Sequence, residues 1–178
     1  MSHFAPSKHI TLFLVAAAIL AGCIAPDATP TVTATAKPLP RKVATLPRPY
    51  NEQADPAPDI AAALKQAKAG NKLVLLDFGA NWCPDCLVLA KHFENAQVKP
   101  FLDKHFIVVK IDVGQWDKNL DIAERYGNPI KQGIPAVVVL NADGKQLAST
   151  ADGSLASAST TQPQDILAYL KQWAEAKP

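Results

Sequence analysis

Continuous apolar runs alternate with segments of helical spacing along residues 59–176, and this alternation predicts the fold. Three runs are apolar almost throughout, which is typical of strands covered on both faces: residues 73–78, 106–113 and 136–140. The turn over residues 141–144 contains Asp143-Gly144, a strong hairpin signal, and predicts a fourth strand over residues 145–149. Apolar positions three and four residues apart predict helices over residues 59–70, 84–95, 119–126 and 161–176. This order predicts an α/β domain with a central mixed sheet of about four to five strands flanked by helices.

Residues at the helix ends support these boundaries. Pro84 suits the first turn of a helix, where a missing N–H loses no hydrogen bond. Thr161 and Gln164 have the spacing of a capping box at the start of the last helix. Gly70 is a plausible C-terminal stop for the first one.

Residues 1–22 have the pattern of an export signal. Lys8 precedes an apolar core over residues 10–20, which is shorter than the about 20 residues of a membrane-spanning helix. The ending Leu20-Ala-Gly-Cys23 resembles the bacterial lipobox, which implies cleavage before Cys23 and lipidation of its sulfur. The alternative is an ordinary secretory signal in which Cys23 stands by chance. Under the lipoprotein interpretation, Ile24 after the cysteine implies transfer to the outer membrane.

Residues 23–58 are predicted to be a tether that follows the lipidated cysteine. Residues 24–58 contain eight prolines among alanines and threonines, a composition that favours extended conformations over a packed core. Fully extended, such a segment reaches on the order of 100 Å. The segment is thus either a disordered leader or a spacer between a membrane and the domain predicted at residues 59–178. The net charge of +2 and the absence of a basic patch exclude nucleic acid as an expected partner.

The candidate chemistry lies in Cys83-Pro-Asp-Cys86, where an apolar strand meets the start of a helix. Backbone N–H groups and the partial positive charge at a helix N-terminus stabilise a thiolate, which favours Cys83 as a nucleophile and Cys86 as the resolving thiol. Structural zinc needs four ligands, and the chain has no second C-x-x-C motif. His92 and His105 are too far apart for a familiar zinc pattern, and Leu87 replaces the histidine of a haem attachment motif. Thiol–disulfide exchange, with no metal or other cofactor, is therefore the predicted chemistry.

Residues 59–176 resemble the thioredoxin superfamily. The resemblance rests on Asp77-Phe78, Trp82-Cys83-Pro84-Asp85-Cys86, Lys110-Ile-Asp112 and Gly133-Ile134-Pro135. Within that superfamily, these residues are most similar to periplasmic thioredoxin-like reductases and to the C-terminal domain of the thiol:disulfide interchange protein. The fold is therefore expected to be a thioredoxin fold. Two departures, Pro84-Asp85 in place of Gly-Pro and a longer segment over residues 113–133, leave the substrate open.

The resemblance also implies roles for residues outside the cysteine pair. Asp77, a carboxylate that would be expensive to bury without a partner, corresponds to a buried acid that moves protons to and from the resolving cysteine, and Lys110 on the neighbouring strand could pair with it. The Ile134–Pro135 bond is expected to be cis, with Ile134 offering backbone hydrogen bonds to an extended substrate. Trp82 is expected to be an exposed platform beside the thiols. Trp116 could belong either to the core or to a substrate-facing loop.

These inferences predict a lipid-anchored thiol:disulfide oxidoreductase that faces the periplasm, in the outer membrane, and reduces disulfides of protein substrates. A membrane electron donor of the thiol:disulfide interchange type would re-reduce it. Asp85 adds a negative charge that disfavours the Cys83 thiolate, which predicts a potential nearer about −270 mV than about −120 mV. The alternatives are an oxidase or isomerase, and a non-catalytic module that binds proteins or handles copper.

Overall fold

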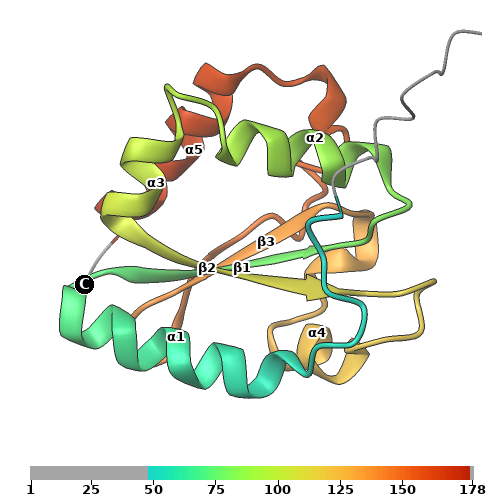
Figure 1. Ribbon diagram of the computed structural model, residues 1–178, viewed down its shortest axis with the longest axis horizontal. Coiled ribbons are helices and arrows are strands. Elements are labelled where there is room, and N and C mark those ends of the chain that lie inside the picture. Colours follow the sequence, from blue (N-terminus) through green and yellow to red (C-terminus); the bar gives the residue numbers. More distant parts are fainter. Residues whose placement is uncertain (1–47, 177–178) are drawn as a thin grey trace, which may run out of the picture. The chain divides into compact units, whose positions relative to one another are not determined.

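A mixed sheet of four strands, in the order β2-β1-β3-β4, forms the centre of the part of the chain that the structure describes (Figure 1). The computed structural model describes residues 48–176, so the predictions for residues 1–47, including Cys23, lie outside the described residues. β1 (Leu73–Gly79) runs parallel to β2 (Phe106–Asp112) and antiparallel to β3 (Ala136–Leu140). β3 pairs antiparallel with β4 (Gln146–Ser149) through the predicted hairpin, in which Gly144 has a φ of 83°. The predicted α/β class and mixed sheet are confirmed.

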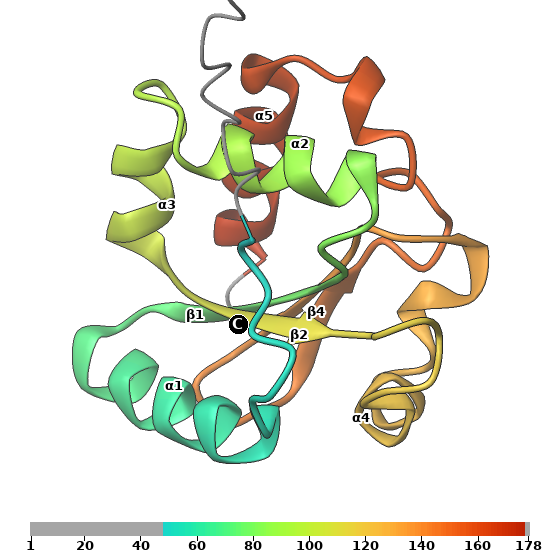
Figure 2. The ribbon, with the colours of Figure 1, turned by 45° about the vertical axis from the view of Figure 1, so that its right-hand side comes forward.

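Helices cover both faces of the sheet (Figures 1 and 2). α2 (Pro84–Phe93), α3 (Lys99–His105) and α5 (Pro163–Glu175) lie on one face. α1 (Pro56–Gly70) and α4 (Leu120–Arg125) lie on the other. Short 3₁₀ helices, η1 (Pro129–Gln132) and η2 (Ala158–Thr160), lie in the connections before β3 and α5. No helix within residues 48–176 is long and apolar enough to cross a membrane.

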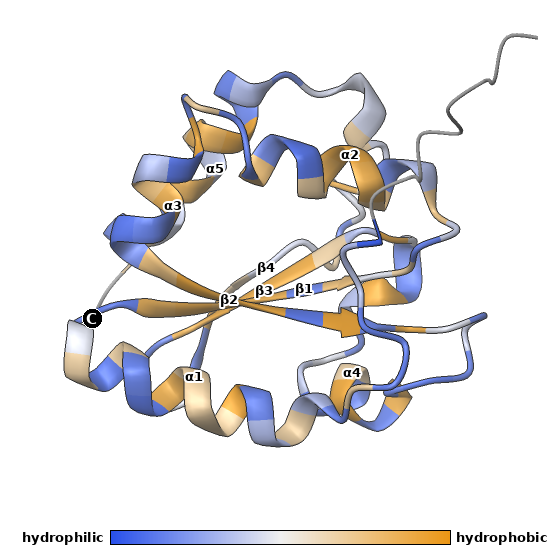
Figure 3. Cartoon of the chain, in the orientation of Figure 1, coloured by the Kyte–Doolittle hydropathy of each residue, from blue (hydrophilic) through white to orange (hydrophobic). Residues whose placement is uncertain are grey.

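The two faces of β1 belong to two separate apolar cores. Val74, Leu76 and Phe78 pack with residues of α1, whereas Leu73 and Leu75 pack with residues of α2, α3 and α5. Every residue of β1 is buried, as its continuous apolar run predicts, and the strands form the apolar centre in Figure 3. Because side chains of a strand alternate between the faces, Asp77 shares the face of Leu73 and Leu75, which α2 covers.

The element boundaries differ from the sequence predictions in three places. α3 was not predicted at all. α5 begins at Pro163, where Gln162 and Asp165 form the capping box, rather than Thr161 and Gln164. The folded part also begins before residue 59, because α1 starts at Pro56, capped by Asp55, and Tyr50 is buried. The predicted boundary at residue 58 between the tether and the folded domain is therefore wrong, because the folded part begins earlier.

Candidate active site

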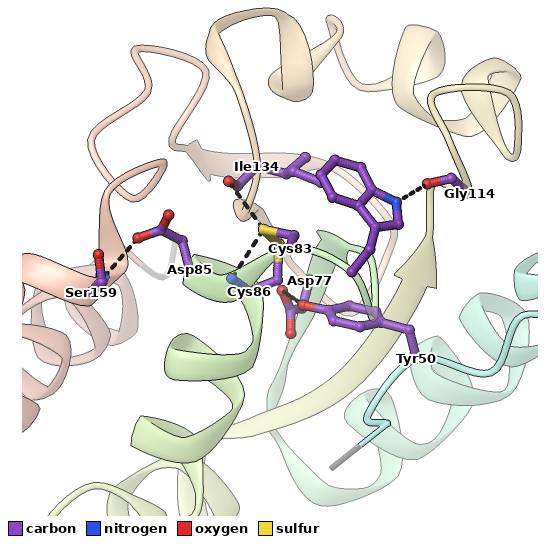
Figure 4. The surroundings of a disulfide bond; sticks show 9 residues. Tyr50, Asp77, Cys83, Asp85, Cys86, Gly114, Ile134 and Ser159 are labelled. Atoms are coloured by element: carbon purple, nitrogen blue, oxygen red, sulfur yellow. Dashed lines mark hydrogen bonds between the residues drawn. A yellow bond between two sulfur atoms is a disulfide. The ribbon is translucent and has the colours of Figure 1, made fainter. Parts of the chain in front are cut away.

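Cys83 and Cys86 form a disulfide at the N-terminus of α2 (Figure 4). Cys83 is the N-cap residue, and the backbone N–H of Cys86 donates a hydrogen bond to its Sγ at 3.1 Å. Cys83 is 4% exposed and Cys86 is fully buried, so the outer sulfur belongs to Cys83. The predicted placement of the pair at a helix start is confirmed. A sulfur at this position accepts from an N–H that the helix leaves unpaired, which favours its thiolate form after reduction.

The two residues between the cysteines have separate roles in the helix start. Pro84 occupies the first turn of α2, as predicted. Asp85 accepts a hydrogen bond from the backbone N–H of Ser159 at 2.8 Å, in the segment that leads to α5. Its carboxylate is thus turned to Ser159 (Figure 4), whereas the sequence interpretation treated it as a free charge beside Cys83.

Ile134, the residue before Pro135, lies against the disulfide. The peptide bond between them is cis, as the resemblance predicted, and it immediately precedes β3. The carbonyl oxygen of Ile134 is 3.6 Å from the Sγ of Cys83. An extended chain bound beside Cys83 would therefore meet the backbone of Ile134.

Asp77 is fully buried and has two hydrogen-bond donors. The Nζ of Lys110 donates to its Oδ2 at 2.8 Å, and the parallel register of β1 and β2 sets the two residues opposite each other. The hydroxyl of Tyr50 donates to its Oδ1 at 3.1 Å. The Lys110 contact was predicted and is confirmed; the Tyr50 contact was not. Burial and the adjacent Asp77 charge raise the pKa of the Tyr50 phenol above its usual value.

Trp82, the residue before Cys83, and Trp116 form a pair of exposed aromatic rings. Trp82 is 45% exposed, as expected for a platform, and its Nε1 donates to the carbonyl oxygen of Gly114 at 2.6 Å. Trp116 is 44% exposed, and the centroids of the two rings are 6.2 Å apart. The alternative that placed Trp116 in the core is therefore wrong. Exposed aromatic side chains next to a reactive sulfur provide apolar surface for a protein substrate.

Within residues 48–176, no three His, Cys, Asp or Glu side chains gather in a way that could hold a metal ion. His105 stacks on Phe101, with ring centroids 4.3 Å apart. Cys83, Cys86 and Asp77 supply the groups that thiol–disulfide exchange uses: an outer sulfur, an inner sulfur and a buried carboxylate on the α2 side of the sheet.

Comparisons with known proteins agree with this geometry. The thioredoxin-like family matches residues 55–142. The thioredoxin of Buchnera aphidicola is 36% identical over 101 residues, which cover 56% of this chain and 81% of that protein. The chain belongs to the thioredoxin superfamily. Its match to thioredoxin H4 of Arabidopsis thaliana, 35% identical over 79 residues, covers 44% of this chain and only 60% of that protein.

Two solved structures give a finer comparison with this thioredoxin-like chain. A structure described as a disulphide isomerase from Xylella fastidiosa Temecula1 is 45% identical with a TM-score of 0.70, over 72% of this chain and 98% of that one. The oxidised C-terminal domain of Neisseria meningitidis DsbD is 25% identical with a TM-score of 0.51, over 67% of this chain and 96% of that one. Fold, family and the Cys83–Cys86 disulfide together support thiol:disulfide oxidoreductase chemistry at this site.

Proposed function

We propose that this protein reduces disulfides of exported protein substrates from a lipid-anchored position on the periplasmic side of the outer membrane. The observation that carries the redox part is the position of Cys83 as N-cap of α2, with the N–H of Cys86 aimed at its sulfur. The likeness to the DsbD C-terminal domain supports disulfide-containing protein substrates and a donor of the thiol:disulfide interchange type. The lipobox-like ending at Cys23 supports the anchor.

The proposed reaction uses two thiols and one carboxylate. The thiolate of Cys83 attacks a substrate disulfide, which forms a mixed disulfide and releases one substrate thiolate. Cys86 then transfers its proton to Asp77 and attacks the Cys83 sulfur, which restores the Cys83–Cys86 disulfide and releases the second substrate thiolate. The substrate gains two electrons and the dithiol loses two. A membrane donor returns two electrons to the Cys83–Cys86 disulfide, and the proton held on Asp77 passes back to Cys86 as the thiol forms again.

The direction of electron flow depends on how strongly the site stabilises the thiolate of Cys83. Asp85 lies in the first turn of α2 and shares the positive end of the helix with Cys83, which weakens that stabilisation. Weak stabilisation of the reduced form makes a dithiol reducing. We expect a potential nearer to about −270 mV than to about −120 mV, measured by equilibration with a glutathione buffer.

Disulfide isomerisation is the second candidate. The specific observation in its favour is the 45% identity to the structure described as a disulphide isomerase. A potential above about −180 mV would favour the isomerase or an oxidase over the reductase.

Substrate trapping tests the proposal. Cys86→Ala removes the resolving thiol, so the mixed disulfide with the substrate should persist and identify the partner by mass. Cys83→Ala is the matched control and should trap nothing. A Cys83→Ala protein with full biological activity would instead favour the non-catalytic binding or copper-handling alternative.

A further inference from the structure

Tyr50 reaches the buried carboxylate of the site from outside the sheet. It lies in the segment before α1, is 2% exposed, and is separated from Asp77 by 27 residues in sequence. Its hydroxyl donates to Oδ1 of Asp77, while Lys110 donates to Oδ2 (Figure 4 shows the Tyr50 contact). None of the motifs found in the sequence includes Tyr50.

The surrounding residues hold Tyr50 in position. The backbone N–H of Tyr50 donates to Oδ1 of Asn81 at 3.1 Å, and Nδ2 of Asn81 donates back to the Tyr50 carbonyl at 2.8 Å. Asn81 belongs to the loop between β1 and Cys83. The Tyr50 ring passes directly over Gly79, where a Cβ would fall within 3.0 Å of its Oη, Cζ and Cε1 atoms. The Nζ of Lys110 lies 5.2 Å from the centre of the ring.

We propose that Tyr50 is a positioning residue for proton transfer at Asp77: its hydroxyl stabilises the carboxylate form that accepts the proton of Cys86. The proposal rests on the proposed function, because it assigns Tyr50 to the resolution step of that reaction. It predicts that the segment before α1 is part of the redox site rather than only a connection to the preceding residues.

The electrostatics around Asp77 support this role. Asp77 is fully buried, and its two oxygens accept hydrogen bonds from Tyr50, in the segment before α1, and from Lys110, in β2. A buried charged group needs such partners. Asp112, at the end of β2, adds a negative charge that also acts on Tyr50. β3 presents only Val137 opposite Asp77, and α2 carries the two cysteines. Because burial and the Asp77 charge raise the pKa of Tyr50, its hydroxyl keeps the proton that it donates.

The Tyr50→Phe variant tests the proposal, because it removes the hydroxyl and keeps the ring that packs on Gly79 and Lys110. Reduced protein is mixed with oxidised glutathione, acid-quenched at intervals, and the mixed disulfide is separated by mass from the closed Cys83–Cys86 disulfide. The rate of closure is measured from about pH 5 to about pH 10. The profile of Tyr50→Phe should move to higher pH by about one to two units, because a hydrogen bond to a charged group contributes on that scale.

Two further variants separate this role from a structural one. Tyr169→Phe removes the same hydroxyl from α5, in the apolar cluster that does not include Tyr50, and should leave the profile unchanged. In an Asp77→Asn background, Tyr50→Phe should cause no further shift, because the group through which it acts is gone. A profile of Tyr50→Phe that stays at the wild-type position, or a shift that persists in the Asp77→Asn background, overturns the role of Tyr50. A wild-type protein that forms no mixed disulfide contradicts the proposed function itself.

Discussion

Gly79 is the position at which a single methyl group should disconnect Tyr50 from the site. The φ of Gly79 lies outside the left-handed region, so an alanine can adopt its backbone conformation. The obstacle is the Tyr50 ring, because a Cβ at residue 79 would fall within 3.0 Å of three of its atoms. Tyr50 is buried, and two hydrogen bonds join its backbone to Asn81. The ring therefore cannot make room for a Cβ at residue 79 without losing its buried position. We therefore expect Gly79→Ala to displace Tyr50.

The magnitude follows from what Tyr50 loses. Burial of a large side chain contributes about 1.5–3 kcal/mol, and a hydrogen bond to a charged group about 1.5–3 kcal/mol. Asp77 keeps Lys110, and a displaced ring keeps part of its contacts, so we expect a loss near the lower end, about 3 kcal/mol. A loss of about 3 kcal/mol corresponds to a fall in Tm of roughly 10 °C.

Chemical and thermal denaturation of four proteins measures this effect: wild type, Gly79→Ala, Tyr50→Ala and the double variant. Tyr50→Ala alone should lose about 3–5 kcal/mol. In that background, Gly79→Ala should lose less than about 1 kcal/mol, because the ring with which it clashes is absent. Gly70→Ala is the control, since an added Cβ there meets only Lys72 at 3.6 Å, and we expect no loss of stability. Additive losses for Gly79→Ala and Tyr50→Ala would refute the reasoning.

Three other predictions address separate parts of the chain. Asp77→Asn should keep the fold and slow the resolution step near pH 7 by about 10²-fold, and an equal rate in wild type and variant from about pH 6 to about pH 9 would reduce Asp77 to a buried polar residue. Burial raises the pKa of Asp112, so the folded protein binds this proton more tightly than the unfolded one, and the resulting stability is present below about pH 4 and lost as the pH rises. Asp112→Asn should therefore raise the stability at pH 7 and lose that advantage in acid, whereas a destabilised variant at pH 7 would show that the charge is well paired with Lys118. Cys23→Ser should accumulate as an unprocessed precursor, and normal cleavage to a soluble mature protein would contradict the lipobox interpretation.

The elements that the sequence predicts well are those whose pattern is local. β1 and β3 are continuous apolar runs, and both are buried throughout. α3 shows the opposite case, since it has only seven residues and a single buried side chain, Leu102, which is too short for helical spacing to register. Tertiary packing against α5 and β2, rather than local propensity, accounts for such a helix.

Contacts within the site divide in the same way. Lys110 could be matched to Asp77 because the family resemblance supplies the neighbouring strand, and the register places the two residues opposite each other. The bond from Ser159 to Asp85 spans 74 residues and ends in an irregular segment, so no pattern in the sequence announces it. The sequence alone does not distinguish a solvent-exposed Asp85 carboxylate from one that accepts a hydrogen bond. The Ser159 contact of Asp85 is therefore a feature that only the structure shows.

Tyr50 was missed for a different reason, since the sequence does contain a trace of it. Gly79 ends a strand that is apolar except at Asp77, and a glycine in a strand often marks a place where another group approaches the backbone closely. That signal predicts a close approach to Gly79 but does not identify the residue that approaches. Tyr50 belongs to a proline-rich segment, and that composition argues against a packed structure. The average composition of residues 23–58 therefore gave no indication that one tyrosine among them is buried. Gly79 and Tyr50 thus belong to one contact. The absence of a side chain at residue 79 leaves room for the Tyr50 ring, whose hydroxyl then reaches the buried Asp77.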